Sequence, residues 1–388
     1  MQTAKIDELV PGGQGIATLE NGKKAFIWNA LPGEIVEFEV TKDKKSYCEG
    51  IARNIQQTSP QRVAPQDACY LDTSPWQIFN YHYELEQKTE LVKKCLAQNH
   101  LIFDVQPTIT DGKDYFYRNK MEYSLYWDNA AAKIFPAFHE RNSHRKQPIT
   151  HSSLERPEIF AAATSAIAEL NAKHAEARAY QSLLIRCNQA GQTSTALFEN
   201  GKPHPKMALL SDQLNGYTYN YSPNGFFQIN LPVYELALKT ITEHLQADQV
   251  LDLYAGVGSI GLSVARDAKN LTLVEVDHAA FNELEHNAAG LPNAHCILDK
   301  SENVTSYLSP NCTVILDPPR AGCDVKLLEA INQILPRTLI YLSCNPITQA
   351  RDLAILRTHY RIDLLQPFNF FPHTPHIENL AVLTCQSD

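Results

Sequence analysis

Short apolar runs alternate with segments of helical periodicity from about residue 221 to the end of the chain. A short apolar run bounded by turn residues is typical of a buried strand, and strands that alternate with helices predict a doubly wound α/β sheet. Two further runs, at 361–366 and 380–384, have no helix between them and predict an antiparallel end to the sheet. The five strands expected before them lie at 249–254, 271–276, 295–298, 313–316 and 339–342.

The pattern at the start of the chain is different. Residues 1–58 hold short alternating segments separated by Pro-Gly and Asn-Gly turns, which predicts a small β-barrel. A connection at 59–75 contains Pro and Ser, and helical spacing follows at 76–99. Strands and loops with one helix at 157–173 then predict a central α+β domain. We therefore expect three domains, at 1–58, 59–220 and 221–388.

Composition narrows the class of protein. The chain has 388 residues, of which 44% are hydrophobic and 20% charged, and it has no apolar run long enough for a membrane span. The amino terminus has no apolar core of a signal peptide, and the nine cysteines are irregularly spaced, so we expect a cytoplasmic protein with reduced thiols. We also expect a monomer. The net charge of −9 argues against a protein whose whole surface is basic and binds nucleic acid, but it is compatible with a local basic groove.

Basic residues gather in two segments that could provide such a groove. A solvated surface would explain both groups equally well, and the aromatic and charged alternation at 117–127 fits either an RNA platform or a half-buried strand. The candidates for phosphate contacts are Lys23, Lys24, Lys42, Lys44 and Lys45 in the barrel, and Lys113, Arg118, Lys120, Lys133, Arg141, Arg145 and Lys146 in the central domain.

A glycine-rich turn follows the first strand of the α/β domain. Gly256, Gly258 and Gly261 have the spacing of a dinucleotide fingerprint, and Glu275 lies at the distance expected of an acid that binds ribose hydroxyls. A plain tight turn is the alternative. The motif fits a nicotinamide dinucleotide or S-adenosylmethionine. Asp252 resembles an acid usual at S-adenosylmethionine sites, and the DPPRAG corner at 317–322 resembles the substrate-side motif of nucleobase methyltransferases, which favours the latter.

A cysteine follows the fifth strand. The run at 339–342 delivers Ser343 and Cys344 at its carboxyl end, and Asn345-Pro346 then ends the strand. Ligands bind at the carboxyl ends of parallel strands, so Cys344 lies where a nucleophile would be useful. A lone cysteine is more often a buried structural residue, but here the neighbouring motifs reverse that preference.

Five motifs occur together and in one order: SPNGFFQIN, DLYAGVG, DPPRAG, YLSCNP and FFPHTPHIE. With them the chain resembles the RNA 5-methyluridine methyltransferases, and its first segment, GGQGIATLENGKKAFIWNALPGEIVEFEV, resembles a TRAM domain. The resemblance covers the whole chain. It implies a TRAM/OB-like barrel, a central RNA-binding domain and a Rossmann-like S-adenosylmethionine-dependent domain. Members with this barrel mostly modify large-subunit ribosomal RNA, which favours 23S ribosomal RNA as the target and leaves transfer RNA as the alternative.

The resemblance also implies roles for single residues. Carbon 5 of uracil is a poor nucleophile, and a thiolate that adds to carbon 6 makes it reactive. Cys344 matches the family's nucleophile, and Glu378 matches the general base that removes the carbon 5 proton. The residues expected to bind the cofactor are Gln228, Tyr254, Gly256, Glu275 and Asp317.

The chain departs from many barrel-bearing members, which hold an iron–sulfur cluster through four cysteines. Cys69 has no CxxC partner, and Cys48 and Cys95 are dispersed, so we expect no cluster. His373 and His376 could be a metal pair, but no third ligand is evident, and shaping the loop or contacting RNA is the better interpretation. Two other classes remain open, namely a nucleotide-dependent oxidoreductase and a non-catalytic RNA-binding protein.

Overall fold

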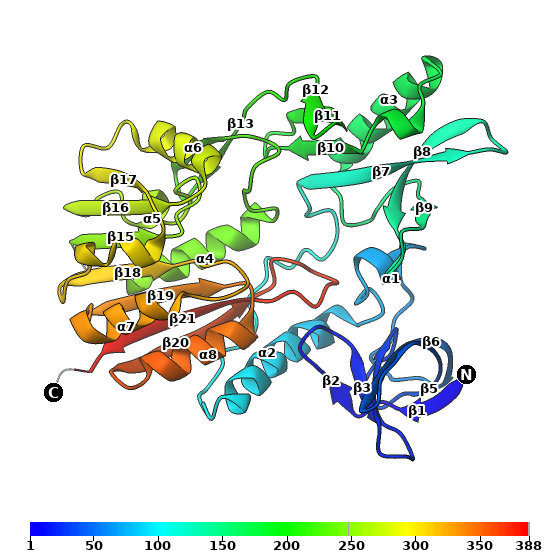
Figure 1. Ribbon diagram of the computed structural model, residues 1–388, viewed down its shortest axis with the longest axis horizontal. Helices are drawn as coiled ribbons and strands as arrows, with labels where there is room; N and C mark the ends of the chain where they lie inside the picture. Colours follow the sequence, from blue (N-terminus) through cyan, green and yellow to red (C-terminus); the bar gives the residue numbers. More distant parts are fainter. Residues whose placement is uncertain (247, 387–388) are drawn as a thin grey trace.

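The computed structural model describes residues 1–246 and 248–386, and its largest sheet is the one predicted from the apolar runs (Figure 1). The sheet has seven strands in the order β17-β16-β15-β18-β19-β21-β20. The five strands β15 to β19 run parallel, and β21 and β20 are antiparallel, as expected. The bounds are β15 (Gln249–Leu253), β16 (Asn270–Glu275), β17 (Ala294–Leu298), β18 (Cys312–Leu316), β19 (Thr338–Ser343), β20 (Tyr360–Phe368) and β21 (Glu378–Cys385).

Helices pack on both faces of this sheet, α7 and α8 in one buried cluster and α4, α5 and α6 in the other. Local sequence explains where two of them begin: Asn345 caps α8 by accepting from the Ile347 amide, and Asp324 caps α7 by accepting from the Lys326 amide. The cap at Asn345 ends β19 sharply and leaves Cys344 at the opening of the sheet. The helices are α4 (Leu231–His244), α5 (Gly261–Val264), α6 (His278–Ala288), α7 (Val325–Ile334) and α8 (Pro346–Leu356).

The amino-terminal segment forms a rolled six-stranded sheet in the order β1-β5-β6-β4-β3-β2. Its interior is apolar, with Ile27, Val36 and Phe38 fully buried. The Asn-Gly signal does mark a hairpin, in which Gly22 takes a left-handed φ of 80°. The strands are β1 (Gln2–Lys5), β2 (Glu8–Leu9), β3 (Gly15–Thr18), β4 (Lys24–Trp28), β5 (Ile35–Asp43) and β6 (Tyr47–Gln57).

The central part has a second six-stranded sheet, in the order β12-β11-β10-β7-β8-β9, with α3 packed on one face. The helix expected at 157–173 is present as α3 (Pro157–Ala172). A two-stranded ribbon of β13 (Leu210–Leu214) and β14 (Tyr217–Tyr221) leads into the largest sheet. The six strands are β7 (Lys120–Asp128), β8 (Lys133–His139), β9 (Lys146–Pro148), β10 (Ser182–Cys187), β11 (Thr193–Glu199) and β12 (Lys202–His204).

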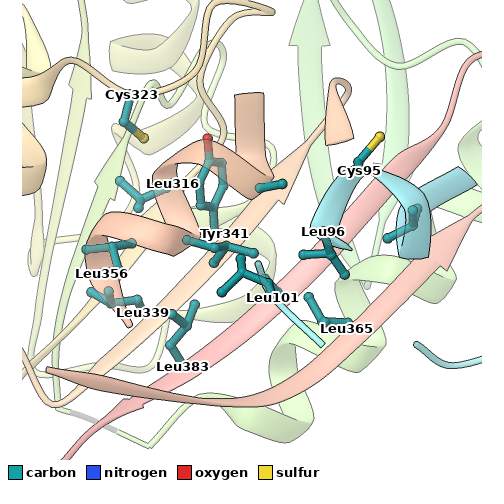
Figure 2. Close-up of a cluster of buried hydrophobic side chains, with 14 of the residues drawn as sticks. Cys95, Leu96, Leu101, Leu316, Cys323, Leu339, Tyr341, Leu356, Leu365 and Leu383 are labelled. Carbon is teal, nitrogen blue, oxygen red and sulfur yellow. The ribbon is translucent and has the colours of Figure 1, made fainter. Parts of the chain in front are cut away.

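Helix α2 (Tyr81–Gln98) connects these parts to the large sheet. It begins at Tyr81, later than the helical spacing suggests, because the Asn80 side chain caps it and the short α1 (Tyr70–Thr73) precedes it. Figure 2 shows Leu96 and Leu101 beside Leu365 of β20, in the same buried cluster as residues of β19 and α8. Helix α2 thus shares its core with the α/β sheet, although it precedes the central sheet in the chain. The division at residues 59 and 221 stays a prediction.

Within the described ranges, no helix is both long enough and apolar enough to cross a membrane.

Candidate active site

Three acidic side chains follow neighbouring parallel strands at the carboxyl edge of the sheet. Asp252 lies near the end of β15, Glu275 ends β16 and Asp317 follows β18. One oxygen of Asp252 (Oδ2) accepts from the Gly261 amide at 2.8 Å, and Oε2 of Glu275 accepts from the Gly256 amide at 2.8 Å. The other oxygen of Asp252 is buried without a hydrogen-bond partner in the described part of the chain. An acceptor in this state lies ready for a donor from a ligand.

The acids also influence one another electrostatically. Burial raises the pKa of Asp252 to about 8, and the charges of Asp317 and Glu275 add to the shift. Burial raises the pKa of Asp317 to about 7. Carboxylates that crowd together in a poorly solvated crevice are stabilised by a positive charge. The edge of the sheet therefore suits a ligand with a cationic group.

The three glycines of the predicted fingerprint are needed for different reasons. Gly256 and Gly258 have left-handed φ values of 57° and 87°. A Cβ at Gly256 would meet no atom within 4 Å, so the turn is open there, whereas at Gly258 it would lie 2.6 Å from the Leu262 side chain. A Cβ at Gly261 would lie 2.6 Å from Asp252 Oδ2. The open side at Gly256 is therefore where a ligand can approach the backbone.

The GFFQIN segment, before α4, separates into buried and exposed residues. Phe227 is buried and stacks on Tyr221 with ring centroids 4.1 Å apart, so it belongs to the core. Phe226 is 76% exposed and is free to contact a ligand. Gln228 is buried, and its main-chain carbonyl accepts from Arg186 at 3.1 Å. Its predicted cofactor contact remains a prediction.

Tyr254 follows β15 in a left-handed conformation, with a φ of 65°. Such a conformation is uncommon outside glycine and often marks a functional turn. The side chain is partly buried against the cluster that includes Leu253 and Cys323, and burial raises its pKa. Its predicted place against the cofactor also remains a prediction.

Cys344 lies half-buried between β19 and α8. Burial raises the pKa of its thiol to about 11, the charges of Glu378 and Asp317 add to this, and Arg320 opposes it. The main-chain carbonyl of Arg320 accepts from the side chain of Asn345 at 2.8 Å. The turn after β18 is thus tied to the residue that follows Cys344.

Glu378 is the first residue of β21 and is 5% exposed. Ser343 pairs with Asn379 across the antiparallel ladder, so the next residues, Cys344 and Glu378, lie opposite one another at the end of this pair of strands. Burial raises the pKa of Glu378 well above its ordinary value, Asp317 adds to this shift, and Arg320 opposes it. The structure therefore brings together Cys344, Glu378 and Asp317, which lie far apart in the sequence. Arg320 was overlooked as a functional residue, although its position in DPPRAG could have indicated it.

These neighbours predict how alkylation of Cys344 depends on pH. Because only the thiolate reacts and its pKa is high, carbamidomethylation of the free protein should speed up about tenfold per pH unit between about pH 7 and pH 10. Arg320→Gln should slow the reaction at a given pH, because it removes a positive charge. Glu378→Gln should speed the reaction up once the pH is high enough to ionise Glu378 in the wild type, because it then removes a negative charge. Mass spectrometry of the Cys344 peptide measures the rate, with the Cys296 peptide as an internal control. An unchanged profile in both variants would contradict the electrostatic account.

The two histidines of the last loop have different surroundings. His376 Nδ1 lies 3.0 Å from an Arg320 nitrogen, and partial burial with this positive charge lowers the pKa of His376. His373 is buried with its ring nitrogens 3.5 Å from Glu84 and 3.4 Å from Asp114. Across the described ranges, no group of three or more His, Cys, Asp or Glu side chains is arranged to hold a metal ion. That both histidines shape the loop or contact RNA stays a prediction.

The expected absence of an iron–sulfur cluster can be tested directly. Cys48, Cys69 and Cys95 are buried on separate elements, namely β6, the start of α1 and α2. We expect protein purified without oxygen to contain far less than one iron per chain and to have no visible absorption band. Near-stoichiometric iron and sulfide would show this prediction to be wrong.

Several of the basic residues proposed for RNA contacts are engaged within the chain. Lys23 pairs with Asp43, and Lys42 pairs with Glu49 at 2.6 Å. Arg141 lies 4.1 Å above the ring of Trp28, which connects the central domain to the barrel. To contact RNA, these side chains would have to release their present partners or bind RNA in addition to them.

Comparisons with known proteins agree with this geometry. Residues 208–386 match the family model described as tRNA (Uracil-5-)-methyltransferase, and residues 1–52 match the TRAM domain model. A protein of Lactiplantibacillus plantarum named as an uncharacterized RNA methyltransferase is 28% identical, with 97% of this chain and 96% of that protein covered. A protein of Bacillus anthracis with the same kind of name is 26% identical over 98% of this chain and 95% of its own length.

The same whole-chain fold occurs in a solved structure. The Pyrococcus abyssi tRNA (uracil-54, C5)-methyltransferase, in complex with S-adenosyl-L-homocysteine, matches with a TM-score of 0.78 and 23% identity, with 99% of this chain and 100% of that chain covered. The barrel, the central domain and the α/β domain are thus one recurring arrangement. In its family matches and its full-length relatives, the chain is therefore similar to the TRAM-bearing RNA uracil-5-methyltransferases.

Proposed function

We propose that this protein transfers a methyl group from S-adenosylmethionine to carbon 5 of a uridine in RNA, with Cys344 as nucleophile and Glu378 as general base. The observation that carries the proposal is the placement of Cys344 beside Glu378 at the opening of the sheet, with Asp317 close to both. A thiol, a buried carboxyl group and an acidic cofactor crevice are the groups that this reaction requires.

The cofactor crevice fits S-adenosylmethionine better than a dinucleotide. The amides of Gly256 and Gly261 donate to Glu275 and Asp252, so neither is free to cradle a pyrophosphate. The acids at this edge would repel a pyrophosphate and attract the sulfonium and ammonium groups of S-adenosylmethionine. The S-adenosyl-L-homocysteine in the Pyrococcus abyssi enzyme supports the same choice. Asp252, Glu275 and Asp317, with the open turn at Gly256, would hold the cofactor, which when bound supplies an electrophilic methyl group.

Cys344 activates the pyrimidine. Its thiolate adds to carbon 6, an S–C6 bond forms, and the electrons of the C5–C6 double bond move to the carbonyl oxygen at carbon 4. The resulting enolate is nucleophilic at carbon 5, where the methyl group is accepted. Arg320 favours the thiolate, because its charge opposes the upward shift of the Cys344 pKa. Positive charge near the thiolate compensates in part for the burial of Cys344.

Glu378 completes the reaction. It takes the proton from carbon 5, the C5–C6 double bond reforms, and the S–C6 bond breaks to release the thiolate of Cys344. A carboxylate with a raised pKa is a stronger base once ionised, and Glu378 is buried among apolar residues such as Phe370 and Ile377. Because Glu378 lies beside Cys344, Cys344 can act on carbon 6 while Glu378 acts on the adjacent carbon 5.

The RNA must present its target outside a helix. A uracil stacked in a folded duplex cannot reach Cys344 at the sheet opening, so a flipped or single-stranded uridine is required. The exposed ring of Phe226 is available to stack on a base of the RNA. The barrel favours 23S ribosomal RNA, but the Pyrococcus abyssi tRNA (uracil-54, C5)-methyltransferase has the same whole-chain fold. The monomeric state and the cytoplasmic location also stay predictions.

The decisive experiment is methyl transfer from labelled S-adenosylmethionine to total RNA of a source strain that lacks this protein. Ribosomal and transfer RNA are separated, and their nucleosides are analysed. We expect label in 5-methyluridine, first of all in 23S ribosomal RNA. Label in transfer RNA alone would show that transfer RNA, and not ribosomal RNA, is the target. Cofactor binding without label in either fraction would favour a non-catalytic RNA-binding protein. Tight NADH binding with no S-adenosylmethionine binding would favour the oxidoreductase.

A further inference from the structure

The loop at 369–377 joins β20 to β21 and delivers Glu378. Both of its ends lie at one rung of the sheet, because Phe368 pairs with Glu378. Figure 1 shows the loop, in red, projecting beyond the ends of these strands towards α2. The shape of the loop therefore influences the position of Glu378 at the end of the ladder.

A buried acid on α2 holds the middle of this loop. Glu84 is fully buried, and its two carboxylate oxygens accept the His373 amide, each at 3.0 Å. The same carboxylate accepts from the Asn369 side chain at 3.1 Å. His373 has a left-handed φ of 61°, a conformation that is uncommon outside glycine, and the bonds to Glu84 hold the backbone at this point.

A buried cation on the next turn of α2 holds the start of the loop. Lys88 is fully buried and pairs with Glu84 at 3.0 Å. Its ammonium group also donates to Asn369 Oδ1 at 2.6 Å and to the Phe371 carbonyl at 3.0 Å. Burying two charges is costly unless other hydrogen bonds compensate, and here those bonds go to the loop.

The amino-terminal barrel reaches the same loop. The Trp76 amide donates to the His373 carbonyl at 3.1 Å, and the Trp76 indole donates to the Gly13 carbonyl at 2.9 Å. Gly13 lies so close to the loop that a Cβ there would overlap the ring of Pro375. The central domain adds one more contact, from the Tyr117 hydroxyl to the Pro372 carbonyl at 3.1 Å.

Helix α2 is a firm support for these contacts. Its apolar residues Leu91, Val92 and Leu96 are buried in the cluster shared with β19, β20 and α8 (Figure 2). The loop is therefore held between the sheet that bears Cys344 and segments that precede the α/β domain in the chain.

We propose that Glu84 and Lys88 of α2, together with the barrel turn at Gly13, are positioning residues for Glu378, and that through them the barrel and α2 control the elimination step. The proposal rests on the assignment of Glu378 as general base. It means that the amino-terminal part of the chain contributes to turnover as well as to RNA binding.

The barrel contact is tested with two matched glycine variants of the full-length protein. Gly12 and Gly13 have φ values of 108° and 95°, so alanine is strained at both, but only at Gly13 does a Cβ meet the loop. Gly13→Ala should slow release of methylated RNA from Cys344 by about 10- to 100-fold, since a displacement near 1 Å has effects of this size. Gly12→Ala should release RNA at the wild-type rate.

The ion pair is tested with the double variant Glu84→Gln/Lys88→Met, which removes both buried charges at similar volume. The introduced amide can accept through one oxygen only, and the introduced thioether donates to nothing, so the loop loses support without an unpaired buried charge. The matched control is Glu90→Gln/Lys93→Met, since this pair lies on the exposed side of the same helix. Binding of S-adenosylmethionine and the melting temperature show whether each variant is folded.

The readout is a single turnover with labelled cofactor, in which covalently bound and free methylated RNA are separated. Folded variants that form the methylated adduct at a near-normal rate but release it slowly, unlike their controls, are the expected result. Wild-type release, or an equal slowing of adduct formation and release, would overturn the proposal. Glu378→Gln is run alongside: if it stalls release and the positioning variants do not, the inference alone fails. If Glu378→Gln releases RNA normally, the base assignment fails and the inference with it.

Discussion

Cys344→Ala should abolish methylation of RNA while S-adenosylmethionine still binds with nearly unchanged affinity. Without the thiolate no covalent bond to carbon 6 forms, and carbon 5 stays unreactive, so we expect a loss on the order of 10⁴-fold or more. The cofactor contacts proposed at Asp252, Glu275 and Asp317 come from other strands than Cys344, which explains why binding should persist. Transfer of labelled methyl groups and calorimetric titration of the cofactor measure the two effects.

A second thiol provides the control for this prediction. Cys296 on β17 is partly buried, and burial raises its pKa as it does that of Cys344. It lies on the edge strand β17, separated by β16, β15 and β18 from β19, the strand that leads to Cys344. Cys296→Ala should therefore keep full activity. Turnover near the wild-type level in Cys344→Ala would remove this cysteine from the mechanism.

The apolar pattern was sufficient to predict the sheet and its opening. Buried parallel strands are nearly continuous apolar runs, which is why β15, β18 and β19 could be located from sequence with small errors at their ends. The absence of a helix between 366 and 380 correctly indicated the antiparallel pair β20 and β21. Cys344 and Glu378 could be nominated because motifs mark them, but their closeness depends on the pairing of β19 with β21, which no local pattern gives.

Other features were hidden because burial by distant segments leaves no local signal. Glu84 and Lys88 have the spacing of an ordinary solvent-exposed helical ion pair, yet both are fully buried beneath the last loop. The choice between stacking and core packing at Phe226 and Phe227 likewise required the structure, since adjacent aromatic residues give the same pattern in both cases. Glu84 and Lys88 belong to contacts between segments far apart in the chain, where sequence periodicity is least informative.

Glu378→Gln should permit methyl transfer but stall the release of RNA. Glutamine has nearly the same shape and cannot take the carbon 5 proton, so the S–C6 bond should persist and a covalent adduct between Cys344 and methylated RNA should accumulate. Burial raises the pKa of Glu378, which means that the folded protein favours its neutral form, and the neutral glutamine should cost little stability at neutral pH.

The Glu378→Gln adduct is detected as a slowly migrating protein band that carries label from S-adenosylmethionine and that ribonuclease shifts towards the mobility of the free protein, with the label retained. The double variant with Cys344→Ala should show no such band. Glu378→Asp, which keeps a carboxylate one carbon further from the ring, should release RNA more slowly than wild type but faster than Glu378→Gln. Because the carboxylate must be ionised to act, release by the wild type should accelerate as the pH rises towards the raised pKa of Glu378. Free 5-methyluridine-containing RNA formed at the normal rate by Glu378→Gln would mean that another group removes the proton, and Asp317, the acid whose charge acts on both Cys344 and Glu378, would be the next residue to test.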